Sequence, residues 1–269
     1  IFLFLAGCST MQPNTPAVPT ATFIPSLSPG TATLPATQTP RPSPEWTQSV
    51  PQVCSPLQGV KLAELAGWVV NPYDPPPQGS DDPHQGIDLA DRNNPDGIAL
   101  SGMPVRAVLT GKVAGFTIDR FPYGNMLMIE SPLEVVLSAG LPMEALPTTL
   151  PELLEGGALS CPDLAILPSG EAELRSLYVL YAHLQSPPAF ALGEEIQCGQ
   201  EIGAIGNSGN ALNPHLHLEV RVGPAGQTFD SMAHYDNSAT PAEMAAYCAW
   251  RVSGLFQTVN PACLWGDCP

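Results

Sequence analysis

Basic side chains are scarce in this sequence of 269 residues. Nine lysines and arginines stand against twenty-five aspartates and glutamates, which gives a formal net charge of −16. Nucleic acids and anionic lipid surfaces are held mainly through lysine and arginine, so this balance excludes binding by phosphate neutralisation and electrostatic docking on anionic lipid. Any anionic polymer would have to be recognised locally rather than through bulk charge.

Long hydrophobic runs are also missing. The first residues read Ile-Phe-Leu-Phe-Leu-Ala-Gly-Cys8, well short of the ~20 apolar residues that cross a bilayer. The run is typical of the second half of a secretory signal peptide, and Leu5-Ala-Gly-Cys8 resembles a bacterial lipobox. We expect residues 1–8 to be a signal remnant with a lipidated Cys8, so that the protein is exported and membrane-anchored at the cell envelope. The alternatives are an ordinary cleaved signal and part of a buried helix.

Residues 9–50 have little that could form a core. They are rich in proline, threonine and serine, and such a segment buries too little apolar surface to offset the entropy of ordering it. We expect a disordered linker that reaches on the order of 100 Å when extended at ~3.1 Å per residue. Residues 51–269 form the domain proper. Their glycine and proline content and the lack of helical periodicity predict a mainly β fold.

Cysteine spacing favours disulfides over a cysteine zinc site, because no Cys-x-x-Cys pair occurs. With Cys8 set aside, six cysteines remain, an even number that suggests up to three disulfides in an exported protein. Fifteen connectivities are possible. One interpretation pairs Cys54, at the start of the domain, with the C-terminal tail.

Histidine is rare but concentrated. Four of the five histidines fall in the motifs His84-Gln-Gly-Ile-Asp88, Tyr181-Ala-His-Leu184 and Pro214-His-Leu-His-Leu218. No helical His-Glu-x-x-His signature is present. The first motif supplies an imidazole and a carboxylate, both accepted by zinc, at the point where a loop enters a strand. Taken alone it is weak. The fifth histidine, His234, has no motif around it and is expected at the surface.

The alternation in residues 215–222 predicts a half-buried strand with residues 215, 217, 219 and 221 on one face. The imidazoles of His215 and His217 would then point the same way, about 7 Å apart. One imidazole can ligate a metal while the other stands beside whatever the metal binds. Taken alone, the pair is more typical of solvated histidines on an exposed sheet face. His183 ends an apolar strand-like run, which by itself is more typical of a core histidine than of a catalytic one.

Together and in this order, the motifs resemble those of the M23 (lysostaphin/LytM-type) zinc metallopeptidases, which cut peptide bonds in bacterial peptidoglycan. The resemblance covers most of residues 66–261. It also rests on the segments Ala66-Gly-Trp68, Gly102–Val113, Tyr123–Ile129, Leu192–Gly203, Gly206-Asn-Ser-Gly209 and Val259-Asn-Pro261.

The resemblance implies an antiparallel β-sheet groove with loop or helical insertions. It implies one zinc ion held by His84, Asp88 and His217 plus a water. It makes His183 and His215 the catalytic pair that flanks this water and the reacting carbonyl. Glu219 would lie on the same strand face as His215 and His217, where it either orients a ligand or meets solvent.

The function implied is a zinc-dependent endopeptidase acting on peptidoglycan stems or cross-bridges. The alternative is a catalytically silent M23-like domain that binds the wall or activates a hydrolase, although all five site residues are present. The chain departs from the family pattern in two insertions, at about residues 131–176 and 224–253. They would either cap the groove and narrow the substrate range or decorate the edge of the sheet.

Overall fold

The computed structural model describes residues 52–77, 80–93, 100–132, 161 and 174–266. The signal remnant, the linker and most of the first insertion lie outside these residues. The helices are η1 (Leu62–Trp68), α2 (Pro241–Arg251) and η3 (Pro261–Trp265). The strands are β1 (Val69–Asn71), β2 (Ile87–Leu89), β3 (Pro104–Arg106), β4 (Gly111–Arg120), β5 (Gly124–Pro132), β6 (Arg175–Leu184), β7 (Glu195–Ile196), β8 (Glu201–Ala204), β9 (Leu216–Pro224) and β10 (Gln257–Val259).

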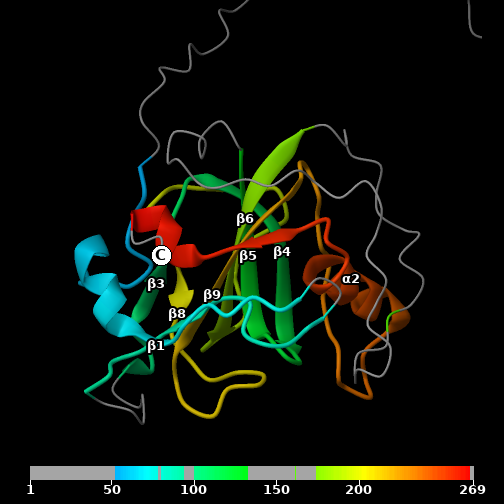
Figure 1. Cartoon of the computed structure of the whole chain (residues 1–269), viewed down its shortest axis with the longest axis horizontal. Helices are drawn as coiled ribbons and strands as arrows, with labels where there is room; N and C mark the ends of the chain where they lie inside the picture. Colours follow the sequence, from blue (N-terminus) through cyan, green and yellow to red (C-terminus); the bar gives the residue numbers. More distant parts are fainter. Residues whose placement is uncertain (1–51, 78–79, 94–99, 133–160, 162–173, 267–269) are drawn as a thin grey trace, which may run out of the picture. The chain divides into compact units, whose positions relative to one another are not determined.

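One large antiparallel sheet dominates the fold (Figure 1). Its strand order is β1-β2-β9-β6-β5-β4-β7, with β10 also pairing with β9, and β3 and β8 form a separate two-stranded sheet. The prediction of a mainly β, antiparallel fold is therefore confirmed. None of the helices in the described part of the chain is long and apolar enough to cross a membrane.

The central strands of the sheet are buried on both faces. On β9, Leu216, Leu218, Val220 and Val222 belong to the larger hydrophobic core. On β5 and β6, Met128, Leu180 and Ala182 belong to a second core on the opposite face, which also contains Tyr247 and Trp250 of α2. The prediction that residues 215–222 form a half-buried strand was therefore wrong in its exposure, because the segment after β9 folds back over the face that we expected to meet solvent.

Helix α2 is the main element of the second insertion. It begins with Thr240 as N-cap, whose side chain accepts a hydrogen bond from the Glu243 N–H, while the Glu243 side chain accepts from the Thr240 N–H. This reciprocal capping, with Pro241 in the first turn, starts the helix. Arg120 of β4 forms an ion pair with Glu243, 2.7 Å between Nη2 and Oε2, and fixes this end of the helix to the sheet.

The disulfides differ from the interpretation drawn from the sequence. Cys54 bonds to Cys198, not to a cysteine of the C-terminal tail. The pairing follows from the path of the chain, because the Cys54 N–H donates to the Val108 carbonyl and Cys198 lies in the turn before β8 that folds against the same segment. Cys161 bonds to Cys248 of α2 and so joins the first insertion to the second. Cys263 is also disulfide-bonded.

Candidate metal centre

The strand register brings Asp88 and His217 side by side. Strand β2 pairs with β9 so that Asp88 lies directly opposite His217, and on the other side of β9 Ala182 lies opposite His217. Directly opposed residues of an antiparallel pair have side chains on the same face. The Nδ1 atom of His217 is accordingly 2.8 Å from Oδ1 of Asp88.

His84 reaches the same point from the loop that leads into β2. Gly86, between His84 and Asp88, lies so close to β9 that a Cβ atom there would be 2.5 Å from the Leu218 carbonyl oxygen. Any larger residue would push the loop away. This contact explains the glycine in His84-Gln-Gly-Ile-Asp88, and it places Nε2 of His84 3.1 Å from Nδ1 of His217 and 3.2 Å from Oδ1 of Asp88.

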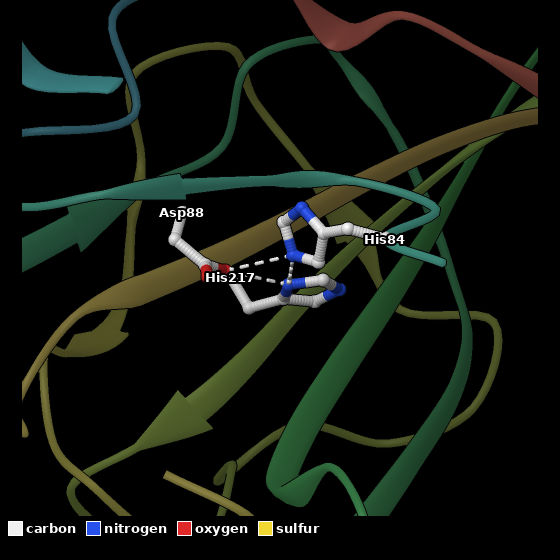
Figure 2. A group of neighbouring side chains, drawn as sticks. All are labelled: His84, Asp88 and His217. Carbon is white, nitrogen blue, oxygen red and sulfur yellow. Dashed lines mark hydrogen bonds and ion pairs between the residues drawn. The ribbon is translucent and has the colours of Figure 1, made fainter. Parts of the chain in front are cut away.

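The three side chains point toward one another (Figure 2). Their ligand atoms, two imidazole nitrogens and one carboxylate oxygen, all lie within 4.8 Å of one another. Two histidines and one carboxylate are a common ligand set for a catalytic zinc, which keeps a fourth position open. The donor chemistry of the group therefore fits the zinc that the sequence motifs implied.

Each of the three side chains is oriented by a hydrogen bond on its far side. Nδ1 of His84 donates to the Pro72 carbonyl (2.9 Å), and Oδ2 of Asp88 accepts from Asn71 (2.9 Å). Nε2 of His217 lies 3.1 Å from Oε1 of Glu219. Such outer partners fix the tautomer and the orientation of ligands in metal sites. They leave Nε2 of His84 and Nδ1 of His217 facing Asp88.

Glu219 is fully buried, so the solvated alternative is excluded. Besides His217, its carboxylate accepts from the Tyr123 hydroxyl (2.8 Å), from Nε1 of Trp250 (3.0 Å) and from both Arg221 and Arg251. Burial alone would raise the pKa of Glu219, but Arg251 and Arg221 outweigh it and hold the pKa well below its usual value. Glu219 is therefore a buried carboxylate ion next to His217.

His183 and His215 lie beside the three candidate ligands. The ring centroids of His183 and His215 are 4.8 Å apart, and that of His183 is 5.8 Å from His217. Nδ1 of His183 donates to the Ser208 carbonyl and Nδ1 of His215 to the Asn213 carbonyl, each at 2.8 Å. Because a carbonyl oxygen only accepts, Nδ1 carries the proton in both rings. In the neutral form, Nε2 of each ring is then free to accept a proton.

The loop Gly206-Asn-Ser-Gly209 sets the position of His183. Ser208 hydrogen-bonds the Leu184 carbonyl and the Asn125 N–H through its hydroxyl, and it holds His183 through its own carbonyl. Gly209 has φ +70°, and a Cβ there would lie 2.4 Å from the Pro122 carbonyl. His183 itself has φ 62°, a left-handed conformation that is uncommon for residues other than glycine and recurs at functional sites.

Burial and charge set the protonation of the group. Burial, together with the nearby His217 and His215, lowers the pKa of His183 to about 3. Burial would raise the pKa of Asp88, but hydrogen bonds with His217 and His84 hold it far below its usual value. Burial would lower the pKa of His217, but its hydrogen bonds to Asp88 and Glu219 raise it to about 9 in the metal-free protein. His183 is thus neutral at pH 7.

All five residues line one pocket of about 740 Å³, a size typical of ligand sites. Val70, Leu212 and Tyr235 also line it, and each exposes at least two fifths of its surface, Leu212 as much as 98%. Exposed apolar side chains around a polar centre suit a ligand that has both polar groups and apolar surface to bury. Tyr235 and Arg251 come from the second insertion, so this insertion contributes to the wall of the pocket.

Two predictions about single residues need correction or extension. His234, expected at the surface, is 2% exposed and stacks edge-on against Tyr235 and at a tilt on Tyr247, because the second insertion packs it against α2. Sequence reasoning also missed Arg251, which donates to Glu219, and Asp81, which accepts from Arg251. Their separation of 170 residues gives no local signal, although Thr240-Pro-Ala-Glu243 marks the helix that carries Arg251.

Fold and site together define a β-sheet protein with a candidate centre for one divalent metal, flanked by two further imidazoles. Residues 172–231 match the model of peptidase family M23. The match spans β6 and β9 and so includes His183, His215 and His217, while His84 and Asp88 lie outside it. It confirms the resemblance found in the sequence motifs.

Several solved structures are similar to this chain. One is the catalytic domain of the prophage-encoded M23 protein EnpA from Enterococcus faecalis (21% identity, covering 60% of this chain and 86% of that chain, TM-score 0.33). Another is the catalytic domain of the antimicrobial peptidase lysostaphin from Staphylococcus simulans (21%, 60% and 86%, TM-score 0.34). A third is a zinc-containing peptidase from Vibrio cholerae (21%, 56% and 32%, TM-score 0.31), of which this chain spans about a third.

Proposed function

We propose that this protein is a zinc-dependent endopeptidase that hydrolyses peptide bonds in peptidoglycan stems or cross-bridges at the cell envelope. The observation that carries the proposal is the arrangement of one ligand set and two further imidazoles in a single pocket. His84, Asp88 and His217 would hold the zinc. His183 and His215 lie beside them, each with Nδ1 committed to a main-chain carbonyl, and Nε2 of His215 lies 3.5 Å from Oδ1 of Asp88. The M23 family match supports the peptidase activity.

Bound zinc would supply a Lewis acid that polarises the scissile carbonyl and activates water for attack. The chain's own residues would manage the proton and the developing charge. A neutral imidazole with a free Nε2 can take the proton from the attacking water and pass it to the departing amine. The second imidazole can donate a hydrogen bond to the oxygen on which negative charge develops.

The tautomer of His183 suits a proton acceptor. Its Nδ1–H is committed to the Ser208 carbonyl, which directs proton exchange to Nε2. His215 is held in the same way by Asn213. Because each ring carries its single proton on Nδ1, Nε2 of either ring can first accept a proton and only then donate one, so we assign the two roles to His183 and His215 as a pair.

The substrate assignment rests on the family and on the compartment. Disulfides form and persist in oxidising compartments, and Cys54–Cys198 and Cys161–Cys248 are both bonded here. This supports export, in agreement with the lipobox-like sequence ending at Cys8. We propose that residues 9–50 tether residues 51–269 to a membrane through the lipid on Cys8, within reach of the wall.

The test uses purified protein loaded with zinc and incubated with purified peptidoglycan, and released peptides are measured by mass spectrometry. The proposal predicts one bound zinc per chain and newly exposed amino groups in the wall. The variants His183→Ala and His217→Ala should both lose this activity, but only His217→Ala should also lose zinc. A folded, zinc-loaded protein that releases nothing from any wall would instead indicate the catalytically silent alternative.

A further inference from the structure

Arg251, in the last turn of α2, has a side chain that is only 11% exposed. Its guanidinium contacts two different parts of the chain. Nη1 donates to Oε1 of Glu219 (2.7 Å) and lies 3.4 Å from the Tyr123 hydroxyl. Nη2 donates to the main-chain carbonyl of Asp81 (2.9 Å), and Nε donates to the Asp81 carboxylate. Every nitrogen of the guanidinium is therefore engaged inside the protein.

The two parts that Arg251 joins are the parts that carry the candidate histidine ligands. Glu219 accepts the hydrogen bond that orients His217. Asp81 begins the short loop that ends at His84, and its carbonyl also accepts from the side chain of Gln85 (3.1 Å). One guanidinium thus fixes the distance between the loop with His84 and the strand with His217.

Asp81 is held in turn by residues of the second insertion. Its Oδ2 accepts from the hydroxyl of Tyr235 (2.9 Å) and from that of Tyr247 (2.7 Å). The cluster contains two buried carboxylates, Asp81 and Glu219, and two buried guanidinium groups, Arg221 and Arg251. Its charges balance, and buried ion pairs of this kind impose a definite geometry on the groups that they connect.

We propose that Arg251, backed by Asp81, is a positioning residue for the metal centre, so that the second insertion helps to hold zinc and does more than cover the sheet. The inference rests on the proposed function, since it takes His84 and His217 as zinc ligands. Arg251 lines the pocket, but each of its three guanidinium nitrogens already donates to a group of the protein.

The chain offers a matched control at the other end of the same helix. Arg120 of β4 also makes a two-pronged contact with a carboxylate, Nε to Oε1 (2.8 Å) and Nη2 to Oε2 (2.7 Å) of Glu243. This pair likewise fixes α2 to the sheet, but neither residue lines the pocket or contacts a candidate ligand. Arg120→Met therefore loosens the helix without touching the metal centre.

The experiment measures the zinc dissociation constant of the full-length protein by competition with a chromophoric chelator. Loss of an outer partner typically weakens metal binding about 10- to 100-fold, and we expect this for Arg251→Met, with less than about a twofold change for Arg120→Met. Asp81→Asn, close in shape to the native side chain, should weaken zinc binding in the same direction. Arg251→Lys should restore little, because one ammonium group cannot replace a fork that spans two segments. Near-ultraviolet circular dichroism establishes which variants remain folded.

The outcomes separate this inference from the proposed function. Unchanged zinc affinity in folded Arg251→Met, equal losses in Arg251→Met and Arg120→Met, or full rescue by Arg251→Lys would each overturn the inference. A raised KM with unchanged zinc affinity would make Arg251 a substrate contact instead. An unmodified protein that binds zinc but cleaves no wall defeats the proposed function alone, whereas one that binds no zinc defeats both.

Discussion

The two faces of strand β9 differ completely in chemistry although both are buried. Leu216, Leu218, Val220 and Val222 point into a continuous apolar core. The residues between them are His217, Glu219 and Arg221, which are joined by hydrogen bonds and ion pairs. Both sets are less than a tenth exposed.

This contrast shows how the two faces of one strand can serve different purposes, one contributing only to folding stability and the other also to the metal centre. The apolar face gains free energy simply by leaving water and tolerates changes that keep its volume. On the polar face, each charged group is stable only because its partner is present, since an unpaired buried charge is costly. We therefore expect substitutions on the polar face to alter both folding and metal binding, and those on the apolar face to alter folding alone.

The largest effect on zinc is expected from His217→Ala. This variant removes a proposed ligand and also leaves Glu219 without its imidazole partner. Zinc affinity should fall by more than the ~100-fold that is typical for loss of an outer partner, and wall hydrolysis should fall to background. Equilibrium dialysis followed by metal analysis checks the first result, and a protein that keeps one zinc at native affinity would remove His217 from the ligand set.

The next largest effect is expected from Glu219→Gln, which keeps the shape of the side chain and removes its charge. Arg221 and Arg251 would then lose the buried carboxylate with which both are paired. Breaking a buried ion pair costs about 3–5 kcal/mol of folding free energy. Urea denaturation of the metal-free protein measures this loss. Glu201→Gln, at an exposed position on β8, is the control and should change stability by about 0.5 kcal/mol or less. Similar values for the two variants would contradict the importance of the cluster.

Val220→Ala tests the apolar face of β9, at the position between Glu219 and Arg221. Removing two methylene equivalents from a fully buried valine should cost about 2 kcal/mol of stability, counting the cavity that is left. Zinc affinity, measured on the folded protein, should not change, because the side chain points away from the metal centre. A marked loss of zinc binding would show that the two faces are not independent.

The last effect concerns pH. In the metal-free protein the pKa of His217 is raised to about 9, above the ~6.5 expected for an unfolded histidine. Its protonation therefore stabilises the metal-free fold fully below pH ~6.5, and this contribution is lost as the pH rises through about 9. Zinc must displace that proton, so its affinity should weaken about tenfold per unit as the pH falls below 9 toward 7.

Isothermal titration calorimetry in buffers with different ionisation enthalpies measures the proton released by zinc binding. We expect about one proton per zinc at pH 7.5 from His217. An affinity that is constant between pH 7 and 9, with no proton release, would mean that His217 is already neutral without metal.

The sequence predicted what local patterns encode. Alternating residues marked β9 and the apolar run marked β6. The residues that flank His84 and Asp88 placed the pair where a loop meets a strand. The exposure of β9 could not be predicted in the same way. Whether Glu219 meets water depends on α2, which lies further along the chain and packs over that face only in the folded protein.

Contacts between residues far apart in the sequence could not be predicted either. Nothing near Cys54 indicates Cys198 as its partner, because the choice depends on how the segment before β3 lies against the turn before β8. Likewise, Arg251 and Asp81 carry no motif, and each looks like an ordinary surface charge until the fold joins them. His234 was misplaced for the same reason, since it packs against Tyr247 of α2.

The central claim is that one zinc ion binds between the loop before β2 and strand β9. Anomalous scattering from a crystal of the zinc-loaded protein, recorded on both sides of the zinc absorption edge, tests it most directly. The account predicts one strong peak at about 2.0–2.2 Å from Nε2 of His84, Nδ1 of His217 and a carboxylate oxygen of Asp88. No peak there, or a peak held by other residues, would contradict it.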